Sequence, residues 1–252
     1  MTVAAPPPEV AEIVENALLG GRVRLRQPAK GYRAGMDAAL LAAAVGCRAG
    51  DRVIEAGCGA GAVLMQIAAR SPGAALTGVE RDEAIADLAR ENAILNNAHA
   101  DIRTGDVAAG FGTLGLEAFD WAVSNPPFFD DPGALRAPSA GKRAAWMADD
   151  GLAAWTGFLL KAVREGGRIV LIHRADRLPD LLSLLGEKAG SFAVRGVHPH
   201  ADEPAKRVLV QAIKAGKAPL RLLPPLVLHE RGGAKHTREA EAILRGEAGL
   251  RW

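Results

Sequence analysis

Short apolar runs alternate along this chain with longer stretches in which apolar residues recur every three or four positions. The runs are typical of buried strands, and the longer stretches of amphipathic helices. The expected strands are 51–55, 75–80, 102–104, 119–124, 168–173, 192–198 and 207–214. The expected helices are 38–45, 62–70, 82–96, 152–164, 178–188 and 237–245. Because helices separate most of the strands, the pattern predicts an α/β fold around a mostly parallel sheet.

Three parts are expected along the chain. Residues 1–15 are predicted to be a loose tail, 16–214 the main domain and 215–252 a small basic appendage. The last helix is expected to begin after Thr237 as its N-cap and to stop at Gly246. Within the main domain, 130–148 is predicted to be a mobile loop.

Composition sets further bounds. The 252 residues and 26.3 kDa suit one large domain, and 49% apolar content is enough for a buried core. Cys47 and Cys58 have neither metal-ligand nor redox-pair spacing, and no apolar stretch reaches the roughly 18 residues of a membrane span. The uncharged N-terminus lacks the features of a signal peptide. A reducing, cytoplasmic compartment is therefore expected.

Charge is distributed unevenly behind a net value of +2. Residues 77–131 hold three basic and eleven acidic residues, whereas 193–252 hold eleven basic and six acidic. Arg22, Arg24 and Arg26 alternate with apolar residues, so on a strand their side chains would share one face. Such a row could contact the phosphates of RNA, or it could be the solvated face of an edge strand that resists aggregation.

A glycine-rich segment follows the first long apolar run. Glu55-Ala-Gly57-Cys-Gly59-Ala-Gly61 lies between an expected strand and an expected helix, where glycines let a ligand approach the backbone and the helix offers unpaired N–H groups. Glu80, 25 residues after Glu55, ends the next strand and is placed to accept ribose hydroxyls. Alone, the glycine pattern also fits a tight turn.

Asn125-Pro126-Pro127-Phe128 follows the expected strand 119–124. The Asn125 side-chain oxygen and the Pro126 carbonyl can each accept one hydrogen of an amino group, and the prolines fix the backbone that holds them. Phe128 can stack on the ring that carries the amine. The alternative is a turn in which prolines end a strand and an aromatic side chain fills the core.

In their order, these features resemble the class I S-adenosylmethionine-dependent methyltransferases that modify amino groups. The segments 18–28 and 31–41, the run Ser124 to Phe129 and the late Pro225 to His229 resemble the tRNA1(Val) adenine-37 N6-methyltransferase family over about residues 16 to 245. One departure is Phe128, where many members have Tyr. The resemblance implies a Rossmann-like fold with a seven-stranded, mostly parallel sheet flanked by helices, S-adenosylmethionine as cofactor and tRNA as substrate.

The resemblance also implies roles for single residues. Those assigned to the cofactor are Gly35, Glu55, Gly57, Gly59, Gly61, Glu80, Asp106 and Val107; those assigned to catalysis are Asn125, Pro126, Pro127 and Phe128. From their charge, and not from the resemblance, Arg22, Arg24, Arg26, Lys206 and Arg207 are assigned to RNA. Asp106 also fits an ordinary turn, and Asp37 fits an N-cap.

Other functions stay open. An rRNA guanine N2-methyltransferase, a release-factor glutamine N5-methyltransferase and a non-catalytic RNA-binding scaffold are the alternatives. The glutamine N5-methyltransferase is disfavoured because those enzymes resemble a longer chain with a helical N-terminal bundle. Only about 50 residues precede Asp51 here. No metal is expected, because the histidines are scattered and His198 and His200 have no third ligand nearby in sequence.

Overall fold

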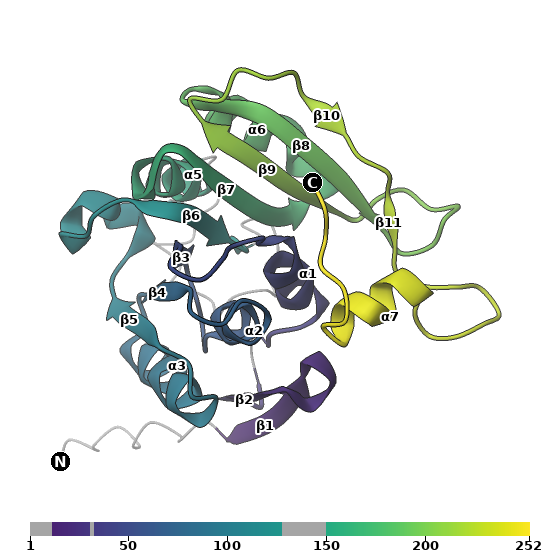
Figure 1. The fold of residues 1–252 in the computed structure, drawn as a ribbon, viewed down its shortest axis with the longest axis horizontal. Helices are drawn as coiled ribbons and strands as arrows, with labels where there is room; N and C mark the ends of the chain where they lie inside the picture. Colours follow the sequence, from purple (N-terminus) through teal and green to yellow (C-terminus); the bar gives the residue numbers. More distant parts are fainter. Residues whose placement is uncertain (1–11, 31–32, 128–149) are drawn as a thin grey trace, which may run out of the picture.

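A central sheet with helices on both faces organises the chain (Figure 1). The computed structural model describes residues 12–30, 33–127 and 150–252. Most of the expected tail, the expected loop 130–148 and Phe128 lie outside these ranges. No helix within them is long and apolar enough to cross a membrane.

In the described part, nine strands form the main sheet, in the order β10-β8-β9-β7-β6-β3-β4-β5 with β11 paired to β8. Every pair is parallel except those of β9, which runs antiparallel to β7 and β8. The strands are β3 (Arg52–Ala56), β4 (Ala75–Glu80), β5 (Ala100–Thr104), β6 (Phe119–Ser124), β7 (Val163–Arg174), β8 (Ala189–His198), β9 (Arg207–Lys214), β10 (Arg221–Leu222) and β11 (Leu226–Val227).

All seven expected strands form, and the predicted α/β fold is confirmed. Two short strands, β10 and β11, widen the predicted seven-stranded sheet at its β8 edge. The largest difference in bounds is β7, which begins at Val163 instead of 168. Gly166, with a φ of +72°, and a shift in the register opposite Phe119 let this extra segment pair with β6.

The helices lie close to their expected bounds. They are α1 (Met36–Ala44), α2 (Ala62–Arg70), α3 (Glu83–Leu95), α5 (Asp150–Ala162), α6 (Leu178–Gly186) and α7 (Arg238–Leu244). Asp82 caps α3 through two backbone amides, and Thr237 caps α7 as predicted. A separate hairpin of β1 (Ile13–Leu18) and β2 (Val23–Pro28) begins inside the range expected to be a loose tail.

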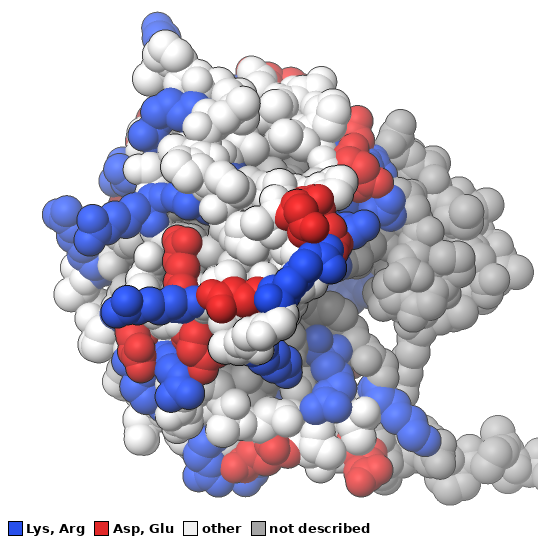
Figure 2. All heavy atoms as spheres, turned by 90° about the vertical axis from the view of Figure 1, so that its right-hand side faces the viewer, with Lys and Arg blue, Asp and Glu red and all other residues white. Residues whose placement is uncertain are grey.

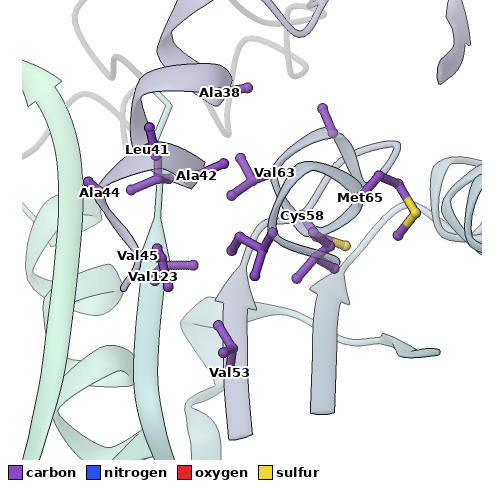
Figure 3. Packing of buried hydrophobic residues seen from close by; sticks show 14 of the residues in the cluster. Ala38, Leu41, Ala42, Ala44, Val45, Val53, Cys58, Val63, Met65 and Val123 are labelled. Atoms are coloured by element: carbon purple, nitrogen blue, oxygen red, sulfur yellow. The ribbon is translucent and has the colours of Figure 1, made fainter. Parts of the chain in front are cut away.

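Two hydrophobic clusters cover the two faces of the sheet. The first packs α1 and α2 on β3 and β6, where Leu41, Val63, Val53 and Val123 are among the buried residues (Figure 3). Helix α1 is alanine-rich and buried along nearly its whole length, because α7 covers the side that the sheet does not. The second cluster packs α5 and α6 on the other face.

Candidate active site

The parallel strands bring four predicted site segments to one edge of the sheet. β3 pairs with both β4 and β6, and β4 pairs with β5, all in parallel. Their carboxyl ends therefore meet, and Glu55, Glu80, Asp106 and Asn125 lie in or just after them. Ligands of open α/β sheets bind outside this edge.

The glycine-rich loop between β3 and α2 is built from residues with left-handed backbones. Gly57, Gly59 and Gly61 have φ values of +68°, +52° and +85°. A Cβ on Gly57 would lie 2.2 Å from the Trp155 ring, so this position has no room for a side chain. No described heavy atom lies within 4 Å of a Cβ placed on Gly59. The open side of the loop is where a ligand can approach the backbone.

Glu80 fixes this loop to the end of β4. Its Oε2 accepts from the Gly59 amide at 3.0 Å, and its Oε1 accepts from the Asp82 amide at 3.0 Å. Each carboxylate oxygen has a second lone pair, so the same group can still accept hydroxyls of a ligand. Glu80, which is predicted to bind the ribose, thus also orients the loop.

Glu55 is a buried acid, with 2% of its surface exposed. Burial, followed by the nearby charge of Glu80, raises its pKa well above the ordinary value, while a hydrogen bond from the Leu64 amide opposes the shift. Among the described residues its Oε2 has no hydrogen-bond partner. A buried, unpartnered carboxyl oxygen beside the open loop fits a ligand that brings a polar or cationic group.

Asp106 caps the short 3-10 helix η2 (Val107–Ala109), because its Oδ1 accepts from the Ala108 amide at 2.8 Å. The turn role considered from sequence is therefore present, and Oδ2 of the same carboxylate can accept from a ligand. The Val107 side chain packs in the second hydrophobic cluster and is 6% exposed. Its predicted contact with the cofactor would have to come from its backbone.

Gly35 and Asp37 begin α1 at the same edge. Gly35 is the N-cap, with an extended φ of −127°, and no described heavy atom lies within 4 Å of a Cβ placed there. The fold therefore does not itself require glycine at this position. Asp37 does not cap the helix, so that alternative is wrong; its Oδ2 instead accepts from Nε of Arg207 at 3.0 Å.

The Asn-Pro-Pro segment leaves the end of β6 beside the glycine-rich loop. Ser124 Oγ donates to the Ala56 carbonyl at 2.8 Å in a buried hydrogen bond, which holds the ends of β6 and β3 together. Pro126 is buried, and Asn125 and Pro127 are half-buried. The predicted amine-binding group and the predicted cofactor loop are thus neighbours.

Asn92 on α3 was not predicted and joins three parts of the site. It is fully buried, its Nδ2 donates to the carbonyls of Arg26 at 2.7 Å and Ala60 at 2.9 Å, and its Oδ1 accepts from the Arg26 amide at 2.8 Å. β2, α3 and the glycine-rich loop are therefore linked through one side chain. The available signal was a polar residue beside Ala89 and Ala93 on the apolar face of the helix.

The predicted RNA-binding arginines in and just before β2 have two different tasks. Arg22 donates to the carbonyls of Arg245 at 3.2 Å and Gly246 at 2.8 Å, at the end of α7. Arg24 and Arg26 are exposed on one face, as predicted, and both pair with Glu15.

Lys206 and Arg207 lie elsewhere, at the start of β9. In the described ranges no group of three or more His, Cys, Asp or Glu could hold a metal ion.

Comparison with known proteins identifies the class. The sequence model of the methyltransferase small domain matches residues 33–139. A tRNA1(Val) (adenine(37)-N6)-methyltransferase of Dickeya chrysanthemi is 29% identical over 76% of this chain and 76% of its own. A predicted O-methyltransferase of Agrobacterium tumefaciens is 28% identical with a TM-score of 0.69, covering 85% of this chain and 98% of its own.

A third similar structure carries ligands. It is a 16S rRNA guanine N2-methyltransferase of T. thermophilus in complex with S-adenosylmethionine and guanosine, 25% identical with a TM-score of 0.59, over 84% of this chain and 53% of its own. The fold, the site and these relatives show that the chain has the class I methyltransferase fold and is an S-adenosylmethionine-dependent methyltransferase. Within that class, the predicted resemblance to the tRNA1(Val) adenine-37 N6-methyltransferase family is confirmed by relatives of that name.

Proposed function

We propose that this protein methylates the N6 amino group of adenine 37 in tRNA1(Val), with S-adenosylmethionine as methyl donor. The observation that carries the proposal is the placement of Asn125-Pro126-Pro127 beside the glycine-rich loop, where Ser124 is bonded to Ala56. The substrate follows the relatives, which are named for this reaction over three quarters of the chain.

The cofactor residues are proposed from geometry and charge. Glu80 would accept from the ribose hydroxyls, Asp106 from the adenine amino group, and the open backbone at Gly59 would lie against the methionine part. The Oε2 of Glu55, at the end of β3 where this loop begins, has no partner among the described residues and would be satisfied by the polar end of the same ligand. S-adenosylmethionine, when bound, supplies a methyl group on a positively charged sulfur.

Asn125 and Pro126 would make the amine reactive. The nitrogen lone pair of an aromatic amine is delocalised into the ring, and two acceptors on its N–H groups favour a more tetrahedral nitrogen whose lone pair points at the methyl carbon. A methyl group transferred to this nitrogen would leave the donor as a neutral thioether, and the proton that the nitrogen gives up would pass to solvent. The Asn125 oxygen and the Pro126 carbonyl stabilise the positive charge that develops on nitrogen.

A base inside a helical stack cannot reach this pocket. The target adenine would have to be unstacked, and this costs least in a single-stranded tRNA loop. An unpaired loop base is therefore the expected substrate, and a duplex RNA of the same sequence should be a poor one.

The test separates substrate classes by the labelled product. The protein and methyl-labelled S-adenosylmethionine are incubated separately with bulk tRNA, ribosomal subunits and release factors, and the products are digested. We expect N6-methyladenosine from tRNA alone. Recovery of N2-methylguanosine or methylglutamine would overturn the substrate and leave the class standing, whereas no label despite cofactor binding would indicate a non-catalytic scaffold.

Asn125→Ala is the matched catalytic variant in this assay. Because Asn125 should act on the amine and not on the donor, turnover should fall about a hundred- to a thousandfold while cofactor affinity stays within a few-fold. A turnover number close to that of the wild type would show that Asn125 does not have this role.

A further inference from the structure

Beyond the Asn-Pro-Pro segment, the carboxyl-end edge of the sheet continues across β7. Leu171 of β7 pairs with Ser124, so Arg174, three residues later, lies past the end of β6. The Ala175 amide donates to the Lys206 carbonyl at 3.2 Å, which joins the end of β7 to the start of β9. Basic residues therefore begin directly beside the segment that carries Asn125.

The same edge extends to β8 and β11. The Lys206 amide donates to the Val197 carbonyl at 3.0 Å, and the His229 amide donates to the Pro199 carbonyl at 2.9 Å. The strands lie in the order β6, β7, β9, β8, so two spacings, about 10 Å, separate β7, where the basic residues begin, from β8.

Three arginines form the part of the row nearest to Asn125. Arg174 lies opposite Arg207 in the β7–β9 register, and Arg177 follows three residues after Arg174. Their side chains are 32%, 30% and 17% exposed, in the order Arg174, Arg207, Arg177. Each holds a carboxylate, and the partners are Asp176, Asp37 and Asp180 respectively.

His173 shows that these charges gather in one place. It is 2% exposed, and its pKa is lowered to about 4 by burial first and then by Arg177, Arg174 and Arg207. Three guanidinium groups therefore act on one buried, neutral imidazole. Arg174 and Arg207 are partly exposed, and a guanidinium group forms strong charge-assisted hydrogen bonds with a phosphate.

Three imidazole rings form the far end of the row. The centroid of His229 lies 5.7 Å from that of His200 and 5.1 Å from that of His236. Nδ1 of His229 is 2.7 Å from the Lys235 carbonyl, which fixes the middle ring. The neighbouring rings are tilted by 51° and 31°, and all three residues are half-buried, so the cluster presents part of its surface to solvent. On the face at the right of Figure 1, basic and acidic side chains interleave (Figure 2).

We propose that this edge is a track for single-stranded RNA, in which Arg174, Arg177 and Arg207 bind phosphates next to the target nucleotide and the His200–His229–His236 cluster receives an unpaired base. The inference rests on the proposed function. Guanidinium groups suit phosphates because they donate in a planar fork. Imidazole rings suit bases because every base has a flat face. Contacts from the ends of β7 and β9 to the loops after β8 and β11 would align a short strand beside Asn125.

The arginine part is tested by salt dependence. Arg174→Gln/Arg177→Gln is compared with Arg164→Gln, whose Nε lies 2.7 Å from Asp120 at the opposite end of β6. We measure tRNA affinity from 50 to 200 mM salt, with S-adenosylmethionine affinity as the control for folding. The double variant should bind tRNA at least tenfold more weakly and lose about one to two units of salt slope, whereas Arg164→Gln should change neither.

The imidazole part is tested by comparing two uncharged replacements of His229, one that removes the ring and one that keeps an aromatic ring. His229→Ala should weaken tRNA binding about five- to a hundredfold at pH 8 without changing the salt slope, and His229→Phe should restore affinity. If wild-type protein labels tRNA adenine but these variants bind like the wild type, the track is wrong and the proposed function stands. If the wild type labels no tRNA, the proposed function itself fails, and with it the track.

Discussion

Gly57 shows how one residue in this site is constrained from two directions. Its φ of +68° lies in the region that favours glycine, and the Trp155 ring fills the space that a side chain would need. The sequence predicted the first constraint, because a glycine-rich segment followed a strand. The second could not be predicted, since Trp155 is 98 residues away in sequence and reaches Gly57 only after α5 has packed on the sheet.

His173 links the site to the pH dependence of stability. Its pKa in the folded protein is about 4, against an ordinary 6.5. Below pH 6.5 the imidazole of His173 is therefore protonated in the unfolded chain, but in the folded protein it stays neutral until about pH 4. The free energy of unfolding consequently decreases as pH falls from 6.5 to 4. The difference contributes about 2 kcal/mol of destabilisation between pH 7 and pH 5.

Replacing this histidine should remove that contribution. His173→Gln should lose less free energy of unfolding between pH 7 and pH 5 than the wild type, by about 2 kcal/mol. Urea denaturation at both pH values measures it, with His99→Gln, at an exposed position just before β5, as the control. Equal pH dependence in wild type and His173→Gln would show that the imidazole is protonated in the folded protein at pH 5.

At the scale of elements, the arginines in and just before strand β2 have different roles. Arg22 has a structural role, whereas Arg24 and Arg26 are candidates for RNA contact. The alternation predicted from sequence is correct for Arg24 and Arg26, which are exposed. Arg22 precedes the strand and reaches α7, more than 220 residues further along the chain. Charge spacing within one segment could not reveal this, because the helix end that uses Arg22 comes from the other end of the sequence.

The two tasks should separate in measurements. Arg22→Gln should lower the free energy of unfolding by about 1 kcal/mol, because two carbonyls at the end of α7 lose their donor, and should leave the salt slope of tRNA binding unchanged. Arg24→Gln/Arg26→Gln should instead reduce that slope by at most about two units. If the double variant keeps the full slope, the pair serves only to hold Glu15 and to charge the outer face of the hairpin.

For the whole molecule, hydrophobic periodicity was enough to predict the succession of strands and helices along the chain and a mostly parallel sheet. Parallel pairing then brings Glu55, Glu80, Asp106 and Asn125 to one edge. Long-range side-chain contacts were outside the reach of such patterns. Asn92, Trp155 and the arginine row past β7 depend on which helix or strand lies beside which, and no local periodicity encodes that.

The contacts of the C-terminal residues bear on whether the whole molecule unfolds as one cooperative unit. The expected appendage 215–252 shares the first hydrophobic cluster through Leu226 and Ile243, and Arg70 donates to the carbonyls of Ile243 at 2.5 Å and Ala248 at 2.8 Å. We therefore expect one cooperative thermal transition for the full chain.

Arg70→Gln should lower its Tm by about 4–8 °C, since leaving two partly buried carbonyls without donors costs roughly 2 kcal/mol. Arg103→Gln, which removes an exposed pair with Asp101, is the matched control and should change the Tm by less than about 2 °C. Circular dichroism follows the helices, and hydrogen exchange of the α7 amides follows the C-terminal part. Should α7 exchange freely in Arg70→Gln while the main transition keeps its wild-type Tm, the C-terminal residues would be a separate unit, as the sequence predicted. A joint shift of both probes would instead mean that α7 is held by the same cooperative core that positions α1, and through Asp37 and Arg207 the edge that carries the active site.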